Sequence, residues 1–295
     1  MFQSLPNGYD RRVLLPLSKT FRFRPFQRLL SQTVNAFFDP RKSLTRSVFT
    51  GWFFACIFGM ATVVRASDYN SQVLTQMREM PHGGNYAASR LATLRLESAT
   101  HIECGKFCIL PDAASPSYCS GATYLVFLKT IEALRSHGKL DLGSPALSAL
   151  LIHGQPDGEG IWGRWNANGP GTARLFHEMG LGRNFDDFNQ ARPGDFMKIF
   201  WSSEVGRLEH GHSVIYLGRE TVGGVEQIRF WSSNIPSGYG EKSVPRSRIA
   251  YAIFSRLEYP ELLNKFDALP PKDPWLAGLT TVRSSIREAR TKTGI

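Results

Sequence analysis

The fold is decided by residues 116–137, which read PSYCSGATYLVFLKTIEALRSH. Apolar side chains recur in this stretch at three- and four-residue spacing, which is typical of a helix with one face toward a core. The stripe comprises Tyr124, Phe127, Leu128, Ile131 and Leu134. We therefore expect a core helix over 120–137, with Gly138 as its stop signal.

Cys119 stands at the start of this predicted helix. Unpaired amide N–H groups and the helix dipole at such a position favour the thiolate form of a cysteine. The same amides can supply part of an oxyanion hole. A thiolate nucleophile also needs a base, and the chain has seven histidines. His212 is the preferred candidate because it heads an expected strand, which would hold the imidazole rigidly; His210 is the alternative.

The sequence around this helix predicts further helices and then strands. Helical patterns cover residues 67–100, with an interruption at Pro81–Gly84, and also the segments 144–151 and 172–179. Two segments are expected to be loops: residues 101–118 and the Gly- and Trp-rich stretch 153–172. Short apolar or alternating runs then predict strands at Phe196–Trp201, His212–Leu217, Gln227–Trp231 and Tyr251–Leu257. Helices followed by antiparallel strands indicate an α+β domain.

The positive charge of the chain is concentrated at its N-terminal end. The net charge is +10, and residues 1–66 hold ten basic but only two acidic side chains, so the remainder carries only +2. So weak a bias gives no support for nucleic-acid binding. Residues 48–64 are a 17-residue run without a charge, preceded by basic residues and followed by small ones. This pattern is typical of a signal peptide, and its length also allows an uncleaved membrane anchor.

We therefore expect three parts: a basic leader with a signal peptide or anchor at 1–66, a folded domain at 67–258, and a C-terminal tail at 259–295. The tail contains Pro260, Pro270, Pro271 and Pro274, and is expected to wrap the domain or to lie partly loose. The basic flank would stay in the cytoplasm, so the domain would be exported to the periplasm or cell envelope.

Three cysteines remain after the apolar run, an odd number for an oxidising compartment. Cys104 and Cys108 are close enough in sequence for a small bridged loop, which leaves Cys119 with a free thiol. A zinc site formed by His101, Cys104, Cys108 and Cys119 is the alternative, but its spacing matches no common zinc pattern. Neither a metal nor a cofactor is therefore expected.

Three motifs in order carry a resemblance to a known family. They are Cys119-Ser-Gly at a helix start, Pro193-Gly-Asp195-Phe-Met-Lys-Ile-Phe, and His212-Ser-Val-Ile-Tyr-Leu-Gly218. Together they resemble the NlpC-type family of bacterial cell-wall cysteine peptidases, which is related to the CHAP amidases. The resemblance covers roughly residues 115–235. It implies a papain-like fold in which a helix-borne cysteine packs on a small antiparallel sheet.

The resemblance also implies roles for individual residues. Cys119 would attack an amide carbonyl, His212 would move the proton, and a polar residue on the next strand would orient the histidine. Asn234 is the first choice for that third residue, because an Asn can accept the imidazole N–H, and Ser232 is the second. Asp195, in its Pro-Gly-Asp turn, is expected to bind nearby backbone N–H groups rather than to act as an acid.

Three aromatic side chains are expected at the substrate surface. They are Tyr118, where the family commonly has an acid, and Trp162 and Trp165 of the Gly-rich stretch. The sequence thus predicts an exported cysteine peptidase or amidase that cleaves peptide or amide bonds, with peptidoglycan or a peptide as its partner. The alternative is a non-catalytic, envelope-associated binding protein on the same fold, with the tryptophans lining its ligand surface.

Overall fold

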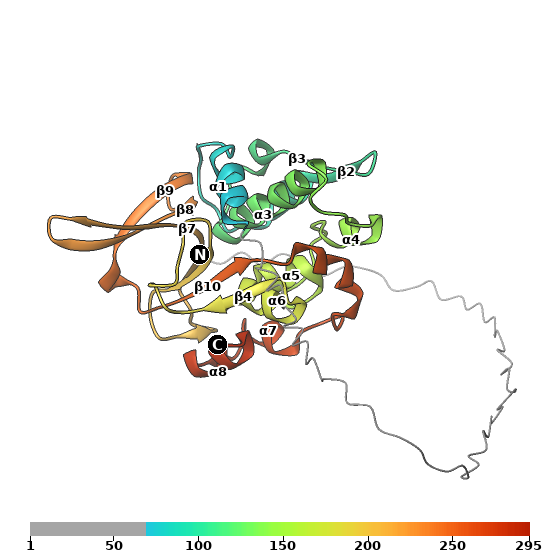
Figure 1. Cartoon of the computed structure of the whole chain (residues 1–295). Helices are drawn as coiled ribbons and strands as arrows, with labels where there is room; N and C mark the ends of the chain where they lie inside the picture. The colour runs from blue at the N-terminus through green and yellow to red at the C-terminus, as the bar shows by residue number, and fades with distance from the viewer. Residues whose placement is uncertain (1–68) are drawn as a thin grey trace, which may run out of the picture. The chain divides into compact units, whose positions relative to one another are not determined.

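A seven-stranded antiparallel sheet forms the centre of residues 69–295, the part of the chain that the computed structural model describes (Figure 1). Its strands are β1 (Gly83–Gly84), β4 (Gly182–Phe185), β5 (Phe196–Phe200), β7 (Gly211–Val222), β8 (Val225–Asn234), β9 (Gly238–Pro245) and β10 (Tyr251–Leu257). Their spatial order is β1-β9-β8-β7-β5-β10-β4, and each neighbouring pair is antiparallel. Two small antiparallel pairs accompany this sheet: β2 (Thr100–Glu103) with β3 (Lys106–Ile109), and β6 (Val205–Gly206) with β11 (Arg283–Ser284).

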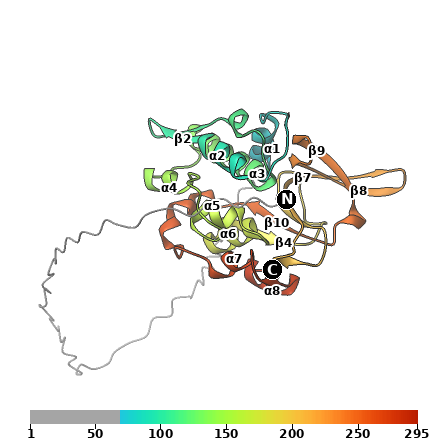
Figure 2. The same ribbon diagram turned by 180° about the vertical axis from the view of Figure 1, so that it is seen from behind.

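Six of the eight α-helices of residues 69–295 precede the run of strands from β4 to β10, and the expected α+β class is confirmed. The α-helices are α1 (Asn70–Arg78), α2 (Arg90–Ser98), α3 (Cys119–Ser136), α4 (Ser144–Ala149), α5 (Gly160–Asn166), α6 (Gly171–Met179), α7 (Pro274–Gly278) and α8 (Ile286–Thr293). The 3-10 helices are η1 (Pro111–Ala114), η2 (Arg246–Arg248) and η3 (Pro260–Ala268). Seen from behind, α5 and α6 lie side by side next to β4 (Figure 2).

Helix α3 is the central helix that residues 116–137 predict. All five members of its apolar stripe are fully buried, and so are its neighbours Leu125 and Val126. The helix therefore packs on more than one side, against α1 and against the sheet strands β7 and β8. A hydrogen bond of 2.9 Å between the Thr123 and Ser213 hydroxyls ties its first turns to the start of β7.

Both faces of the central strands are buried. Side chains alternate along β7, so that Ile215 joins the core shared with the helices while Val214 and Tyr216 enter a second apolar cluster on the opposite face. Phe230 of β8 belongs to the second cluster and Trp231 to the first. This packing on two faces holds the strands that carry His212 and Asn234.

Two segments expected to be loops contain regular structure. Residues 101–118 include the hairpin of β2 and β3, whose turn residues Cys104 and Gly105 both have positive φ. Such φ values suit a two-residue hairpin turn, although a cysteine there is uncommon. Residues 153–172 contain helix α5, so the predicted long loop at this place is wrong.

The last part of the chain is folded onto the domain. Leu276, Leu279 and Ala289 are buried, and Arg283 of β11 pairs with Gly206 of β6. The segment 259–295 therefore wraps the domain, which is the first of the two forms that its prolines predict.

Asp195 has the structural role that its turn predicts. Its side chain is fully buried and accepts the Arg192 backbone N–H at 2.7 Å. It also accepts hydrogen bonds from Arg256 at 2.7 and 2.8 Å and from the Asn70 amide at 2.8 Å. The carboxylate thus ties α1, the turn before β5, and β10 together.

The predicted leader and the apolar run 48–64 lie outside the described residues. Within residues 69–295, none of the helices combines the length and the apolar character needed to cross a bilayer.

Candidate active site

Cys119 is the first residue of α3 and is partly exposed. The residue before it, Tyr118, has an extended backbone, and no side chain among the described residues caps the helix at this end. The first N–H groups of α3 therefore point toward the thiol with their positive dipole ends.

The thiol of Cys119 is acidic for a cysteine. Burial raises its pKa. The pKa is lowered by a hydrogen bond with His212 and the charge of that residue, and further by the Ser213 backbone N–H and the charge of Lys198. The net result is a decrease of the Cys119 pKa from 9.0 to about 7. A thiol with this pKa is about half ionised at neutral pH. Such a group is a competent nucleophile.

His212 lies at the start of β7, with its ring between two aromatic side chains. The Trp201 ring stacks near it at a centroid distance of 6.4 Å, and Phe230 meets it edge to face at 5.6 Å. This packing fixes the ring orientation. The alternative base, His210, lies two residues earlier and is exposed. His212, and not His210, lowers the pKa of the Cys119 thiol, so His212 is the better-supported candidate base.

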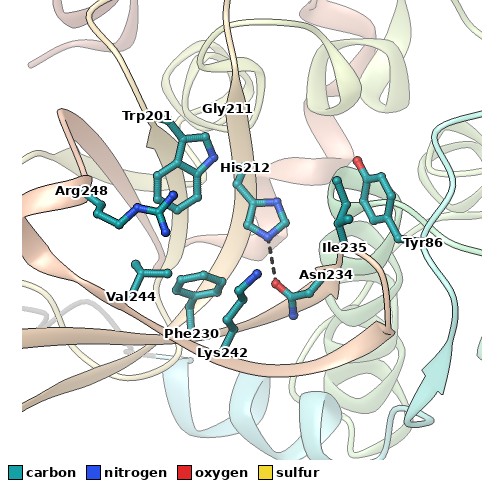
Figure 3. Close-up of a pocket in the computed structure, with 10 residues that line it drawn as sticks. All are labelled: Tyr86, Trp201, Gly211, His212, Phe230, Asn234, Ile235, Lys242, Val244 and Arg248. Carbon is teal, nitrogen blue, oxygen red and sulfur yellow. Dashed lines mark hydrogen bonds between the residues drawn. The ribbon is translucent and has the colours of Figure 1, made fainter. Parts of the chain in front are cut away.

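Asn234 is the last residue of β8, and its Oδ1 lies 3.1 Å from His212 Nε2 (Figure 3). The Asn234 amide nitrogen donates to the backbone oxygens of Gly240 at 2.8 Å and Ser232 at 3.2 Å, so Oδ1 is the atom left to face the imidazole. The Ser232 hydroxyl instead donates to the Ser213 backbone oxygen at 2.7 Å. Of the two residues proposed from the sequence, Asn234 is therefore the one beside His212.

Tyr86 is a site residue that the sequence analysis does not identify. Its hydroxyl hydrogen-bonds Cys119, and burial, together with the charge and hydrogen bond of that thiol, raises the pKa of Tyr86 to about 12. Backbone hydrogen bonds from Tyr86 N–H to Pro236 and from Ala87 N–H to Ser117 hold the segment across the start of α3. Tyr86 belongs to no motif and to no regular element, so nothing in the sequence marks it.

A cavity of about 440 Å³ opens in front of Cys119. Lys198 and Glu209 line it and form an ion pair of 2.5 Å between Nζ and Oε1. A second hollow of about 320 Å³ adjoins it on the side of Tyr118 and Asp157. Cys119 and Tyr86 line both hollows, so the nucleophile lies where they meet.

The three aromatic residues expected at the substrate surface are distributed differently. Tyr118 lines the smaller hollow, although it is only 8% exposed, and its hydroxyl lies 3.4 Å from that of Thr93. Trp165 is 2% exposed and forms part of the wall of the larger cavity, where its indole N–H donates to the Ser120 backbone oxygen at 3.2 Å.

Trp162 lines none of these hollows and is 1% exposed, because α5 turns it into the core against Tyr124. The expectation that Trp162 stacks on a ligand is therefore wrong.

The four residues of the alternative zinc site do not come together. His101 and Cys108 are cross-strand partners on the β2–β3 hairpin, and their ligand atoms group with that of Glu103 within 4.8 Å. Neither Cys104 nor Cys119 belongs to that group. Cys104, Cys108 and Cys119 are all free thiols, so the considered bridge between Cys104 and Cys108 is not formed.

Comparison of the chain with protein-family models, with curated proteins and with solved structures finds no match.

Proposed function

We propose that this protein is a cysteine hydrolase that cleaves peptide or amide bonds, with a papain-like arrangement of its active site. The observation that carries the proposal is the set Cys119, His212 and Asn234. A thiol with a pKa of about 7 stands at a helix start, beside an imidazole that a buried amide orients. Nucleophile, base and orienting group on three separate elements form the arrangement used in cysteine hydrolysis.

The reaction begins with transfer of the Cys119 thiol proton to His212. Because Nε2 faces Asn234, the nitrogen that receives this proton is Nδ1. The thiolate then attacks the carbonyl carbon, and His212 gives the proton to the departing amine. The resulting thioester is hydrolysed when His212 takes a proton from water and the hydroxide displaces the sulfur. The second product is a carboxylic acid, and Cys119 is regenerated.

The negative oxygen of each tetrahedral intermediate needs hydrogen-bond donors. The backbone N–H of Cys119, in the uncapped first turn of α3, is one donor. The Tyr86 hydroxyl, which lies at the Cys119 sulfur, is a second. The reaction requires no cofactor.

The substrate class and location follow from the sequence. The three ordered motifs resemble NlpC-type peptidases, whose usual substrates are peptide bonds of peptidoglycan stems. The basic, apolar and small-residue pattern of residues 1–66 favours export to the cell envelope. We therefore place the reaction at peptide or amide bonds of the cell wall.

The test is digestion of purified peptidoglycan by the full-length chain, with products identified by mass spectrometry. We expect the unaltered protein to release fragments with new amine and carboxyl ends, and the Cys119→Ala variant to release none. Cys104→Ser is the matched control, because it removes an exposed thiol outside the site and should retain activity. Cleavage by Cys119→Ala would contradict the assignment. Binding of peptidoglycan without cleavage by the unaltered protein would instead support the non-catalytic binding protein.

A further inference from the structure

A third hollow lies against His212 and Asn234. It has a volume of about 270 Å³. Tyr86, Trp201, Gly211 and Ile235 line both this hollow and the cavity of Cys119. The remaining lining residues are His212, Phe230, Asn234, Lys242, Val244 and Arg248 (Figure 3). A ligand that extends from the reacting thiol past His212 would therefore enter it.

Two cationic side chains point into this hollow. Lys242 comes from β9 and Arg248 from η2, and both direct their charged ends toward the space around His212 and Phe230 (Figure 3). Both residues are exposed at the rim. No acidic side chain within residues 69–295 forms an ion pair with either of them. Two unneutralised cations that converge on one hollow make it attractive to an anion.

The neighbouring Arg229, unlike Lys242 and Arg248, forms ion pairs with acidic side chains. It lies on β8, is partly exposed, and pairs with Glu241 at 3.0 Å and Glu220 at 3.9 Å. Arg229 and its two acidic partners lie on the opposite face of the sheet from Lys242, whose cross-strand neighbour is Phe230.

Part of the wall of the hollow is apolar. Phe230 and Val244 are almost fully buried and form its floor, and the Trp201 ring forms one side. Aromatic and aliphatic walls suit an apolar side chain. The hollow therefore combines a site for an apolar group with a site for a negative charge.

We propose that this hollow, bounded by Trp201, Phe230, Lys242 and Arg248, binds a carboxylate of an acidic peptide substrate beside an apolar side chain. The inference rests on the proposed function, because it assigns the substrate class of the same site. Lys242 and Arg248 hold the carboxylate, and Trp201 and Phe230 contact the adjoining apolar group. The two cations are then specificity residues, which select acidic over neutral peptides.

The test uses binding alone, so it does not depend on catalysis. The full-length Cys119→Ala variant is titrated with three probes, and binding is followed by calorimetry. N-acetyl-phenylalanine offers a terminal carboxylate, N-acetyl-aspartyl-phenylalaninamide offers a side-chain carboxylate, and N-acetyl-phenylalaninamide is neutral. We expect at least one acid to bind about tenfold more tightly than the neutral amide, and the preferred acid identifies the carboxylate source.

Variants of the two cations test whether the preference for acids arises in this hollow. Adding Lys242→Gln and Arg248→Gln should reduce the preference to about onefold to twofold, whereas the matched control Arg229→Gln should keep it. Equal binding of acids and amide, or a preference that survives loss of both cations, would overturn the inference. Such a result leaves the proposed hydrolase intact, because peptidoglycan cleavage by the unaltered protein tests that function separately.

Discussion

His212 Nε2 lies 3.1 Å from Asn234 Oδ1, and the Asn234 nitrogen donates to two backbone oxygens at the same time. Because the Asn234 nitrogen already donates two hydrogen bonds, the oxygen of the amide faces the imidazole as an acceptor. His212 therefore carries a hydrogen on Nε2 and donates it to Asn234 Oδ1. The lone pair of the neutral ring then resides on Nδ1, the nitrogen that must accept a proton from Cys119. One side-chain amide thus selects the tautomer of the neutral imidazole.

Replacing Asn234 by Ala should lower kcat/KM about 10²-fold, because the imidazole loses both its orientation and its preferred tautomer. The measurement is the initial rate of peptidoglycan digestion. Ser232→Ala is the control, since that hydroxyl bonds the Ser213 backbone oxygen rather than the imidazole. Equal losses in the two variants would show that Asn234 acts through the stability of β8 instead.

Labelling of Cys119 by iodoacetamide should follow the thiolate fraction and rise with pH through an inflection near 7. In His212→Ala the burial that raises the thiol pKa remains while the main effects that lower it are lost. The inflection should therefore move upward from about 7 toward 9.0, the ordinary thiol value. Mass spectrometry of the labelled peptides measures the extent of labelling at each cysteine separately, and the exposed Cys104 serves as the internal control. An unchanged inflection in His212→Ala would show that the imidazole does not affect the pKa of the Cys119 thiol.

Tyr86→Phe should lower kcat about 10²-fold, because it removes one donor to the negative oxygen of the intermediate while keeping the ring. KM should change little, since that oxygen carries full charge only after attack. Steady-state kinetics of peptide release distinguish the two parameters. A rise in KM with kcat unchanged would make Tyr86 a substrate-binding residue only.

Asp195→Ala should lower the free energy of unfolding by about 3–5 kcal/mol, because it leaves the buried guanidinium of Arg256 without its carboxylate. Urea denaturation followed by tryptophan fluorescence measures the loss. The activity of the fraction that remains folded should be unchanged. A variant with normal stability and no activity would instead make Asp195 part of the reaction.

The sequence predicts the elements around the candidate site best where local pattern and tertiary packing agree. The α3 stripe and the strand headed by His212 are such places, because every residue of the stripe is buried and so are the central apolar residues of the strand. Strand β9 is missed because it contains Gly238, Gly240 and Lys242 and has no alternating apolar pattern. It forms by pairing with β8, a long-range interaction that no local signal reports.

Helix α5 is missed for a related reason. Its glycines suggest a loop, yet a side chain at Gly163 would collide with the backbone of Pro156, so the glycine permits close packing of the helix. That packing also buries Trp162, which the glycine-rich context had suggested for ligand binding. Tyr86 could not be identified at all, because only the folded chain brings it to Cys119.

The three residues of the candidate active site lie on α3, β7 and β8, and the chain is synthesised in that order. Cys119 is made long before His212 and Asn234, and before the sheet forms its thiol has neither the imidazole nor the Ser213 amide to stabilise its charge. In a nascent or unfolded chain Cys119 is therefore an ordinary thiol. Under the proposed function, cleavage of a bond would begin only after the sheet has packed against α3.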